Sequence, residues 1–415
     1  MISVDEALKT ILDSIRPLSL EKANILEALG RVLGEDIISG RDIPPGDNSA
    51  MDGYALRAAD TLFASRRNPV TLRVVEDIPA GHMPKRKIRA GEASRIMTGG
   101  LIPGGADAVL RVEDTEGAGK QVRILVPVKP GTDIRPAGED VKKGEPVLFR
   151  GNIIRPAEIG MLSSLGRSFI KVFQRPVVAI IATGDELVDV DEPVLPGKIV
   201  NSNSYALAAQ VTECGGITMQ LGIAKDNRED LEAKFKGALR ADVIISSGGV
   251  SVGDYDFVKD VMKEIGSKIQ FWKVAMRPGR PLAYGTLGGK PLFGLPGNPV
   301  SSMVSFEQFV RPALLKMMGY RNLFRRSVQA VLMENITKAS DVRSFLRARV
   351  SFEKGQYRVS TTGEQGSGIL KSMVRANGLI ILPEKITRAK KGDTVTVQLL
   401  DGSLDTSLNP EYLQK

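Results

Sequence analysis

The sequence predicts a multidomain protein of mixed α/β and β class, with a parallel α/β domain between β-rich segments. Its 415 residues are too many for one ordinary hydrophobic core, so the chain is expected to form several domains. Between residues 173 and 320, apolar runs alternate with helical patterns, which indicates a parallel sheet with helices on both faces. On either side, short apolar runs are separated by glycine and proline, which is typical of β domains.

The N-terminal part predicts a β-rich domain inserted into a helical one. Apolar residues recur at helical spacing in VDEALKTILDSI and in LEKANILEALGRVL, so we expect two helices within residues 1–44. Residues 45–140 contain the short runs VTLRVV, SRIMTG, DAVLRV and VRILVP, and are expected to form the inserted β-rich domain. Residues 141–172 contain the helical segment PAEIGMLSSLG, and with residues 1–44 they predict a helical and mixed connecting domain.

Residues 173–320 predict the α/β domain. VVAIIATG and DVIISSGG are continuous apolar strands, whereas SYALAAQVTECGG and YDFVKDVMKEIG have helical patterns closed by glycine. VSSMVSFEQFVRPALLKMMG predicts an amphipathic helix that ends at Gly319. Residues 321–415 return to short strands and predict a C-terminal β domain. Its strand segments are SVQAVLME, FLRARVSF, YRVSTT, GLIILPE and DTVTVQLL.

Composition indicates a globular chain of a reducing compartment. Hydrophobic residues make up 42% of the chain, and no run approaches the roughly 18 to 20 apolar residues of a membrane span. The first residues, MISVDEALKTILDSI, are amphipathic and acidic, so we expect neither secretion nor membrane insertion. Cys214 is the only cysteine, which excludes an intramolecular disulfide and a cysteine metal cluster. We therefore expect a cytoplasmic protein.

The net charge of +9 suits an anionic partner, which could be nucleic acid, a membrane surface or a small phosphorylated substrate. The basic residues are scattered, and aromatic residues that could stack on bases make up only 5% of the chain. These observations favour a small phosphorylated substrate over nucleic acid or a membrane.

Three loops at the predicted carboxyl ends of strands combine glycine with small polar residues. They are residues 183–187, 246–254 and 295–299. Glycine lets a backbone approach a phosphate closely, and the following helix contributes positive potential at its N-terminus. For any one loop alone, a capped strand-to-helix turn is the favoured interpretation, but three such loops together favour a phosphate site. The candidate residues are Ser246, Ser247, Gly248, Gly249, Ser251, Gly253, Pro296, Gly297 and Asn298.

Charged residues adjoin these loops. Carboxylates beside a phosphate usually indicate Mg²⁺, although each could instead cap a helix or lie on a solvated turn. The acidic candidates are Asp185, Glu186, Asp226, Asp254 and Asp256. In the segment FWKVAMRPGRP, Lys273, Arg277 and Arg280 could hold an oxyanion or simply face solvent.

Nine motifs occur in order between residues 42 and 367, and the resemblance that they carry covers the chain from about residue 5 to about residue 400. They are DIPPGDNSAMDGYA, RIMTGGLIPGGADAV, IRPAGEDVKKGE, ATGDEL, GKIVNSNSYAL, DVIISSGGVSVGDYD, FWKVAMRPGRP, GLPGNPVSS and TTGEQGS. Through these motifs the chain resembles the molybdopterin molybdenumtransferase family, which includes MoeA and the gephyrin E domain.

The resemblance implies a transferase of molybdenum cofactor biosynthesis. Members of that family are homodimers of four domains that take adenylylated molybdopterin and molybdate. In an Mg²⁺-dependent step they release AMP and place the metal on the dithiolene sulfurs of the substrate. A separate molybdopterin adenylyltransferase is then expected to supply the substrate.

The resemblance also carries site residues onto this chain. The implied catalytic residues are Asp52, Thr98, Asp140, Glu186, Asp226 and Asp256, with Glu186 and Asp256 as magnesium ligands. The implied residues for substrate and oxyanion are Lys273, Arg277, Arg347 and Ser367. Arg277 and Arg280 stand where lysine is common in the family, and bidentate arginine geometry could alter oxyanion preference. The resemblance further implies that Asp52 of one subunit acts together with Lys273 of the other.

Three alternatives remain open at this point. The same chemistry could insert tungstate, and the same α/β domain occurs in enzymes that adenylylate molybdopterin with ATP. The DNSAMDGYA module and the C-terminal β domain favour the insertion enzyme. A scaffold role is disfavoured because no adenylylating domain or long linker is fused to the chain. His82, the only histidine, lies in a turn-like segment and receives no role.

Overall fold

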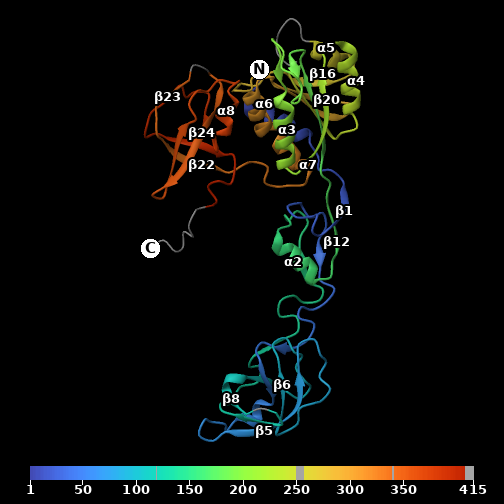
Figure 1. Cartoon of the computed structure of the whole chain (residues 1–415), viewed down its shortest axis with the longest axis vertical. Helices are drawn as coiled ribbons and strands as arrows, with labels where there is room; N and C mark the ends of the chain where they lie inside the picture. Colours follow the sequence, from blue (N-terminus) through green and yellow to red (C-terminus); the bar gives the residue numbers. More distant parts are fainter. Residues whose placement is uncertain (118, 249–256, 339–340, 407–415) are drawn as a thin grey trace. The chain divides into compact units, whose positions relative to one another are not determined.

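The computed structural model describes residues 1–117, 119–248, 257–338 and 341–406 (Figure 1). The chain divides into two compact units. The main unit consists of Met1–Glu21 and Val172–Lys415, and the inserted unit is the continuous segment Lys22–Lys171. Their boundaries fall within two strands, β1 (Leu20–Asn24) and β12 (Phe169–Phe173).

A six-stranded sheet forms the centre of the α/β domain, with the order β16-β13-β17-β21-β20-β18. The strands are β13 (Val177–Thr183), β16 (Ile217–Ala224), β17 (Val243–Ser247), β18 (Lys268–Phe271), β20 (Ala283–Leu287) and β21 (Lys290–Leu295). The first four strands in this order are parallel, as predicted, whereas β20 and β18 are antiparallel to their neighbours. The direction reverses at Gly288 and Gly289, whose φ values of 55° and 78° suit a two-residue hairpin turn.

Helices cover both faces of this sheet, which confirms the prediction from the sequence. Side chains of a strand point alternately to its two faces, so Val178 and Ile180 join one core while Ala179 and Ile181 join the other. Residues of α1, α3, α6 and α7 complete the first core, and residues of α4 and α5 complete the second. The helices are α1 (Val4–Ser14), α3 (Ser202–Glu213), α4 (Arg228–Ala238), α5 (Phe257–Glu264), α6 (Pro299–Ser305) and α7 (Arg311–Met317). None of the helices in the described part of the chain has the length and apolar character that a membrane span requires.

The helical segment predicted before Gly319 forms, but with one wider turn inside it. A π-helical turn, Phe306–Val310, separates α6 from α7. Pro312 lies in the first turn of α7 and lacks the N–H of other residues, so the wider turn precedes a position without a backbone donor. Gly319 follows with φ of 77°, a conformation that glycine adopts readily at a helix end.

The C-terminal domain is a small β-barrel, coloured orange to red in Figure 1. Its strands are β22 (Ser327–Leu332), β24 (Arg343–Glu353), β25 (Gln356–Thr361), β26 (Gly378–Leu382) and β28 (Thr394–Leu399). Each overlaps a predicted segment, although β24 extends beyond its segment at both ends and β25 begins one residue earlier. The pairing runs β24-β25-β22-β28-β26, and β26 returns to β24, so the sheet closes on itself. A short strand of the α/β domain, β19 (Met276–Arg277), pairs in parallel with the start of β24. The barrel is therefore joined directly to the segment that carries Arg277.

The inserted unit contains a six-stranded sheet of order β7-β4-β6-β5-β9-β8. Its strands are β4 (Gly53–Leu56), β5 (Val70–Ile78), β6 (Glu92–Ile96), β7 (Ala108–Arg111), β8 (Thr115–Glu116) and β9 (Gln121–Ile124). Strand β5 contains the predicted run VTLRVV, and β6, β7 and β9 each overlap part of one of the other three predicted runs. Helix α2 (Pro156–Ser164) forms where PAEIGMLSSLG predicts it. The remaining short strands of the unit are β2 (Ile37–Ile38), β3 (Asn48–Ser49), β10 (Ile134–Arg135) and β11 (Pro146–Leu148).

The second helix predicted from LEKANILEALGRVL does not form. Its first residues belong to β1, and the following residues are turns whose backbone bonds to a distant part of the chain. The N–H of Ile25 donates to the carbonyl of Ser168, and the N–H of Leu33 donates to the carbonyl of Asn152. Tertiary hydrogen bonds thus replace the local helical bonds that the apolar spacing suggests.

Candidate active site

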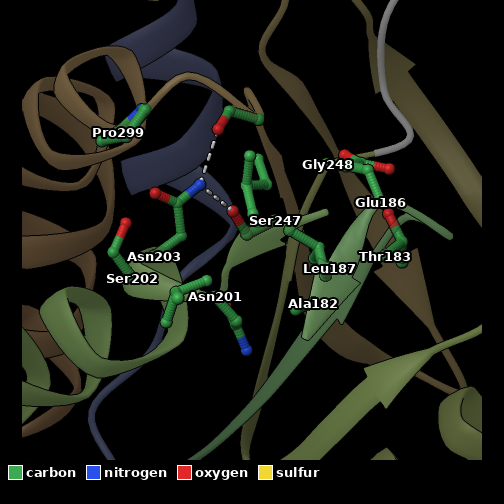
Figure 2. Close-up of a pocket in the computed structure, with 13 residues that line it drawn as sticks. Ala182, Thr183, Glu186, Leu187, Asn201, Ser202, Asn203, Ser247, Gly248 and Pro299 are labelled. Carbon is green, nitrogen blue, oxygen red and sulfur yellow. Dashed lines mark hydrogen bonds between the residues drawn. The ribbon is translucent and has the colours of Figure 1, made fainter. Parts of the chain in front are cut away.

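Two of the predicted phosphate loops and part of the third meet at the carboxyl ends of β13, β17 and β21. There they line a cavity of about 60 Å³, the strand-end pocket (Figure 2). Its lining includes Thr183, Glu186, Asn201, Asn203, Ser247, Gly248, Gly297 and Pro299. Parallel strands place their carboxyl ends at one edge of the sheet, so the fold brings these loops together from distant parts of the chain.

Asn203 connects two of these loops. Its Nδ2 donates to Ser247 Oγ at 2.9 Å and to the Gly297 carbonyl at 2.8 Å (Figure 2). Asn203 lies in the first turn of α3, and Asn201 caps that helix by accepting a hydrogen bond from the N–H of Ser204. Our sequence reasoning did not select either asparagine. The polar run NSNS before an apolar helix is the signal that could have identified them.

The backbone approaches itself closely at Gly248. Gly248 has φ of 91°, and a Cβ atom there would lie 2.5 Å from the Thr183 carbonyl oxygen. Only glycine suits that conformation and that space. Beside it, the hydroxyls of Thr183 and Ser246 are buried and have no hydrogen-bond partner within the described residues. Such hydroxyls can donate to a phosphate oxygen.

Carboxylates lie at the edge of the strand-end pocket. Asp226 donates its N–H to the Asp185 carboxylate at 3.0 Å, and Asp185 donates its N–H to the Asp226 carboxylate at 3.3 Å. This reciprocal pair fixes the two loops to each other, next to Glu186, which lines the pocket. Within the described residues, no group of three or more acidic, histidine or cysteine side chains is arranged to hold a metal ion. Asp256, the other predicted magnesium ligand, lies outside those residues.

A second cavity, of about 490 Å³, contains the predicted cationic residues. This arginine pocket is lined by Met276, Arg277, Pro278, Gly279, Arg280, Pro281, Pro296, Asn298, Ser301, Gln365, Gly366 and Ser367. The segment after β19 supplies the arginines, and the loop before α8 (Leu370–Val374) supplies Ser367. The N–H of Val300 donates to the Ser367 carbonyl at 3.1 Å, which ties the barrel to the start of α6. Two guanidinium groups and two serine hydroxyls are donors suited to an oxyanion.

In the inserted unit, Asp52 and Thr98 come together as a pair. One carboxylate oxygen of Asp52 accepts the backbone N–H and the hydroxyl of Thr98, each at 2.7 Å. The bonds from the N–H and then from the hydroxyl lower the pKa of Asp52, so this exposed carboxylate is ionised near neutral pH. Asp140 lies elsewhere, donating its N–H to the Ile43 carbonyl, and is exposed.

Comparison with known proteins shows the family. Three family models match in order: MoeA N-terminal region (domain I and II) over residues 2–166, "Probable molybdopterin binding domain" over 179–316, and MoeA C-terminal region (domain IV) over 329–400. Molybdopterin molybdenumtransferase 2 of Mycobacterium tuberculosis (strain CDC 1551 / Oshkosh) is 40% identical over 403 residues, covering 96% of this chain and 99% of that protein. Molybdopterin molybdenumtransferase of Staphylococcus aureus (strain COL) is 36% identical over 404 residues, 96% of each. The chain belongs to the MoeA family.

A solved MoeA family structure agrees with the whole fold. The MoeA protein of Pyrococcus horikoshii superimposes with a TM-score of 0.84 at 34% identity, over 97% of this chain and 100% of that chain. The resemblance read from the nine motifs and the multidomain α/β and β class are therefore confirmed.

The positions carried over from the MoeA family do not all fall in the two pockets. Arg347 lines a third cavity next to the arginine pocket, and Ser367 lines the arginine pocket itself. Lys273 lines none of these three cavities, and its carbonyl accepts the N–H of Ile2. Gly249, Ser251, Gly253, Asp254 and Asp256 lie outside the described residues.

Proposed function

We propose that this chain is a molybdopterin molybdenumtransferase that inserts molybdate into adenylylated molybdopterin and releases AMP. One observation carries the proposal: a single loop, residues 295–299, lines two chemically different pockets. Gly297 and Pro299 line the strand-end pocket, whereas Pro296 and Asn298 line the arginine pocket. The proposed phosphate site and the proposed molybdate site therefore lie on either side of one loop. A reaction that joins a phosphorylated pterin to molybdate requires the two sites to be adjacent.

The chain's own groups supply binding and positioning. Around the strand-end pocket, the buried hydroxyls of Thr183 and Ser246 and the glycine-rich backbone at Gly248 can bind phosphate oxygens. In the arginine pocket, Arg277 and Arg280 can bind a dianion such as molybdate. Cleavage of a phosphoanhydride depends mainly on orientation and charge stabilisation. The dithiolene sulfurs of the substrate receive the metal, so no protein thiolate is needed.

Magnesium fits the acidic edge of the strand-end pocket. The side chains there are carboxylates, and oxygen is the ligand that Mg²⁺ prefers. Glu186, which lines the pocket, and Asp256 would hold the ion, which when bound would neutralise charge on the phosphate oxygens. Asp185 and Asp226 already accept each other's backbone N–H groups and hold the two loops together.

We expect Glu186→Gln and Asp256→Asn to slow Mg²⁺-dependent AMP release, because each removes a negative charge from the proposed ion site. The rate should fall by at least about tenfold, and added Mg²⁺ should restore part of it. AMP release would be followed against Mg²⁺ concentration. Glu192→Gln is a suitable control, because Glu192 is an exposed acid of the same region that accepts the N–H of Asp189 and lines none of the three cavities. A variant with the wild-type rate at every Mg²⁺ concentration would show that its residue does not bind the ion.

Purified protein supplied with adenylylated molybdopterin, molybdate and Mg²⁺ should form molybdenum cofactor and AMP in equal amounts. Cofactor can be measured by reconstitution of a cofactor-free molybdoenzyme, and AMP by chromatography. Tungstate in place of molybdate tests the alternative oxyanion, because Arg277 and Arg280 bind either dianion through the same donors. If the protein instead forms adenylylated molybdopterin from molybdopterin and ATP, and does not consume adenylylated molybdopterin, it is an adenylyltransferase.

We also propose an oligomeric state, a source of substrate and a cellular location for the enzyme. The enzyme is a homodimer, in which the inserted unit of one subunit supplies Asp52 to the α/β domain of the other, and the family resemblance supports this arrangement. A separate adenylyltransferase would supply the substrate. We also propose a cytoplasmic location, which is supported by Cys214 being the only cysteine of the sequence, so that no intramolecular disulfide can form.

A further inference from the structure

The helical segment that begins at the two pockets also contacts the C-terminal barrel. Helix α6 starts within loop 295–299, which lines both the strand-end pocket and the arginine pocket. The π turn, Phe306–Val310, follows α6, and its buried aromatic residues belong to the first core of the α/β domain. Two barrel residues, Phe345 of β24 and Leu379 of β26, belong to that same core. The barrel and the helical segment therefore share one apolar core.

A hydrogen bond between two amide side chains connects the π turn to a barrel strand. Gln308 of the π turn donates from its Nε2 to the Oε1 of Gln398 in β28, at 2.6 Å. Gln398 is buried and Gln308 is half-buried. A buried amide is unfavourable unless it is hydrogen-bonded, so a barrel orientation that separates the two residues leaves a buried amide without a partner. The bond therefore favours the orientation in which the two amides meet.

The same π turn holds the linker that leads into the barrel. Glu307 is buried and accepts from the Nε of Arg325 at 2.9 Å, just before β22 begins. The Nη2 of Arg325 donates to Glu213 at the end of α3, also at 2.9 Å. Arg311, at the start of α7, donates from its Nη1 to the Leu323 carbonyl at 3.2 Å. The helical segment thus contacts both the linker before the first barrel strand and the last barrel strand.

Polar and apolar contacts contribute differently to such an interface. Apolar burial is non-directional, so it favours contact between the barrel and the helices without selecting one orientation. Hydrogen bonds and ion pairs are directional, and a buried partner that loses its bond is costly. The polar contacts of the π turn therefore select one barrel orientation among those that the apolar core allows.

The orientation of the barrel determines the composition of the arginine pocket. Residues 365–367 of the barrel line this cavity together with the arginine-bearing segment after β19. Two backbone bonds join the barrel to the α/β domain there. The N–H of Val300 donates to the Ser367 carbonyl at 3.1 Å, and the N–H of Arg343 donates to the Ala275 carbonyl at 3.0 Å. A barrel that turned on the helical segment would break these bonds and carry residues 365–367 away from the arginines.

We propose that the π turn is a positioning element for the use of molybdate. Gln308 and Gln398 hold the barrel in the orientation that places residues 365–367 in the arginine pocket, and Glu307 with Arg325 holds its linker. Neither glutamine lines any of the three cavities, so both act on the reaction through the barrel. The inference rests on the proposed function, in which the arginine pocket binds molybdate. Use of adenylylated molybdopterin, whose phosphates are assigned to the α/β domain, should not depend on the glutamine pair.

Hydrogen exchange of the full-length protein, followed by mass spectrometry, measures the docking of the barrel. In Gln398→Leu, the amides of Val300 and Arg343 should exchange at least about fivefold faster than in the wild type, because their acceptors lie across the interface. The amides that pair β22 with β28 should keep their protection, which would show that the barrel itself is folded. Gln308→Leu removes the other partner and serves as the second variant in case Gln398→Leu does not fold.

The matched control is Gln329→Leu. Gln329 lies on β22 and donates to the Thr396 hydroxyl at 3.2 Å, so its hydrogen bond is within the barrel and does not cross the interface. The substitution is chemically the same as in the test variants and lies in the same domain. We expect wild-type exchange at Val300 and Arg343 and wild-type kinetics for this control.

Steady-state kinetics distinguish positioning from stabilisation. In each single variant, the KM for molybdate should rise at least about fivefold, whereas the KM for adenylylated molybdopterin and the kcat at saturating molybdate should not change. The double variant Gln308→Leu/Gln398→Leu leaves neither amide unpartnered, so its melting temperature should return to that of the wild type. Its KM for molybdate should stay raised, because apolar contact does not select one orientation.

Two results would overturn the inference. One is wild-type exchange at Val300 and Arg343 in both single variants, and the other is a wild-type KM for molybdate in the double variant, which would mean that the amide pair only stabilises the barrel. Arg280→Ala identifies a failure of the proposed function, because Arg280 lines the arginine pocket itself. If Arg280→Ala leaves the KM for molybdate unchanged, the assignment of that pocket is wrong, and the positioning inference with it. If Arg280→Ala raises this KM and the glutamine variants do not, only the positioning inference is wrong.

Discussion

Gly248→Ala should reduce kcat/KM for adenylylated molybdopterin by about 100-fold or more, which corresponds to about 3 kcal/mol of lost transition-state stabilisation. The added Cβ would lie 2.5 Å from the Thr183 carbonyl oxygen and 3.0 Å from its hydroxyl oxygen. Because the clash is with backbone, the end of β13 and the loop after β17 must move apart. That movement displaces Ser247 and the hydroxyl of Thr183 from the strand-end pocket, where the proposed phosphate site lies.

An alanine substitution at a second glycine distinguishes the effect of this steric clash from the effect of a positive φ angle. Gly289 also has a positive φ, 78°, but a Cβ atom there would meet nothing within 4 Å. Gly289→Ala therefore carries the same kind of conformational strain, on the order of 1 kcal/mol, without the clash. We expect it to lower the melting temperature slightly and to leave kcat/KM unchanged. Steady-state kinetics and thermal unfolding of both variants would be compared. Wild-type kinetics for Gly248→Ala would show that the close approach at Thr183 has no role in the reaction.

The sequence predicted the α/β core well because its strands are unambiguous. VVAIIATG and DVIISSGG are apolar on both faces, and the glycines that follow them stop the strands where the loops begin. The position of the phosphate loops at one edge then follows from parallel topology alone. Three strands of the barrel were also predictable, because β22, β26 and β28 contain short apolar runs bounded by turn residues.

Other features depend on contacts that no local pattern reveals. Residues 20–33 have helical spacing, yet their backbone bonds to residues 152–171, more than 100 positions away. Asn203 matters because it reaches Ser247 and Gly297, which follow two different strands. The burial of Arg347 depends on closure of the barrel around it, and a lone arginine in FLRAR gives no sign of that. The conformation of residues 20–33, the contacts of Asn203 and the burial of Arg347 all depend on residues that are distant in the sequence.

The active site should be rebuilt in a mixed dimer of two inactive variants. We propose that Asp52 of one subunit acts at the strand-end pocket of the other, so Asp52→Ala and Gly248→Ala homodimers should each be nearly inactive. Asp52 is exposed, and its loss leaves only the Thr98 donors to be solvated, so the Asp52→Ala variant should fold normally.

Co-refolding equal amounts of the two variants should restore up to about a quarter of wild-type activity. In a mixed dimer, one site carries both substitutions, and the other combines the intact Asp52 of one chain with the intact Gly248 of its partner. Random pairing makes half of the dimers mixed, and half of the sites in those dimers are intact. The activity should rise in proportion to the mixed dimer counted by native mass spectrometry, and refolding either variant alone provides the baseline. If mixed dimers form without any gain in activity, Asp52 and Gly248 belong to the same chain's site, and the proposed sharing between subunits is wrong.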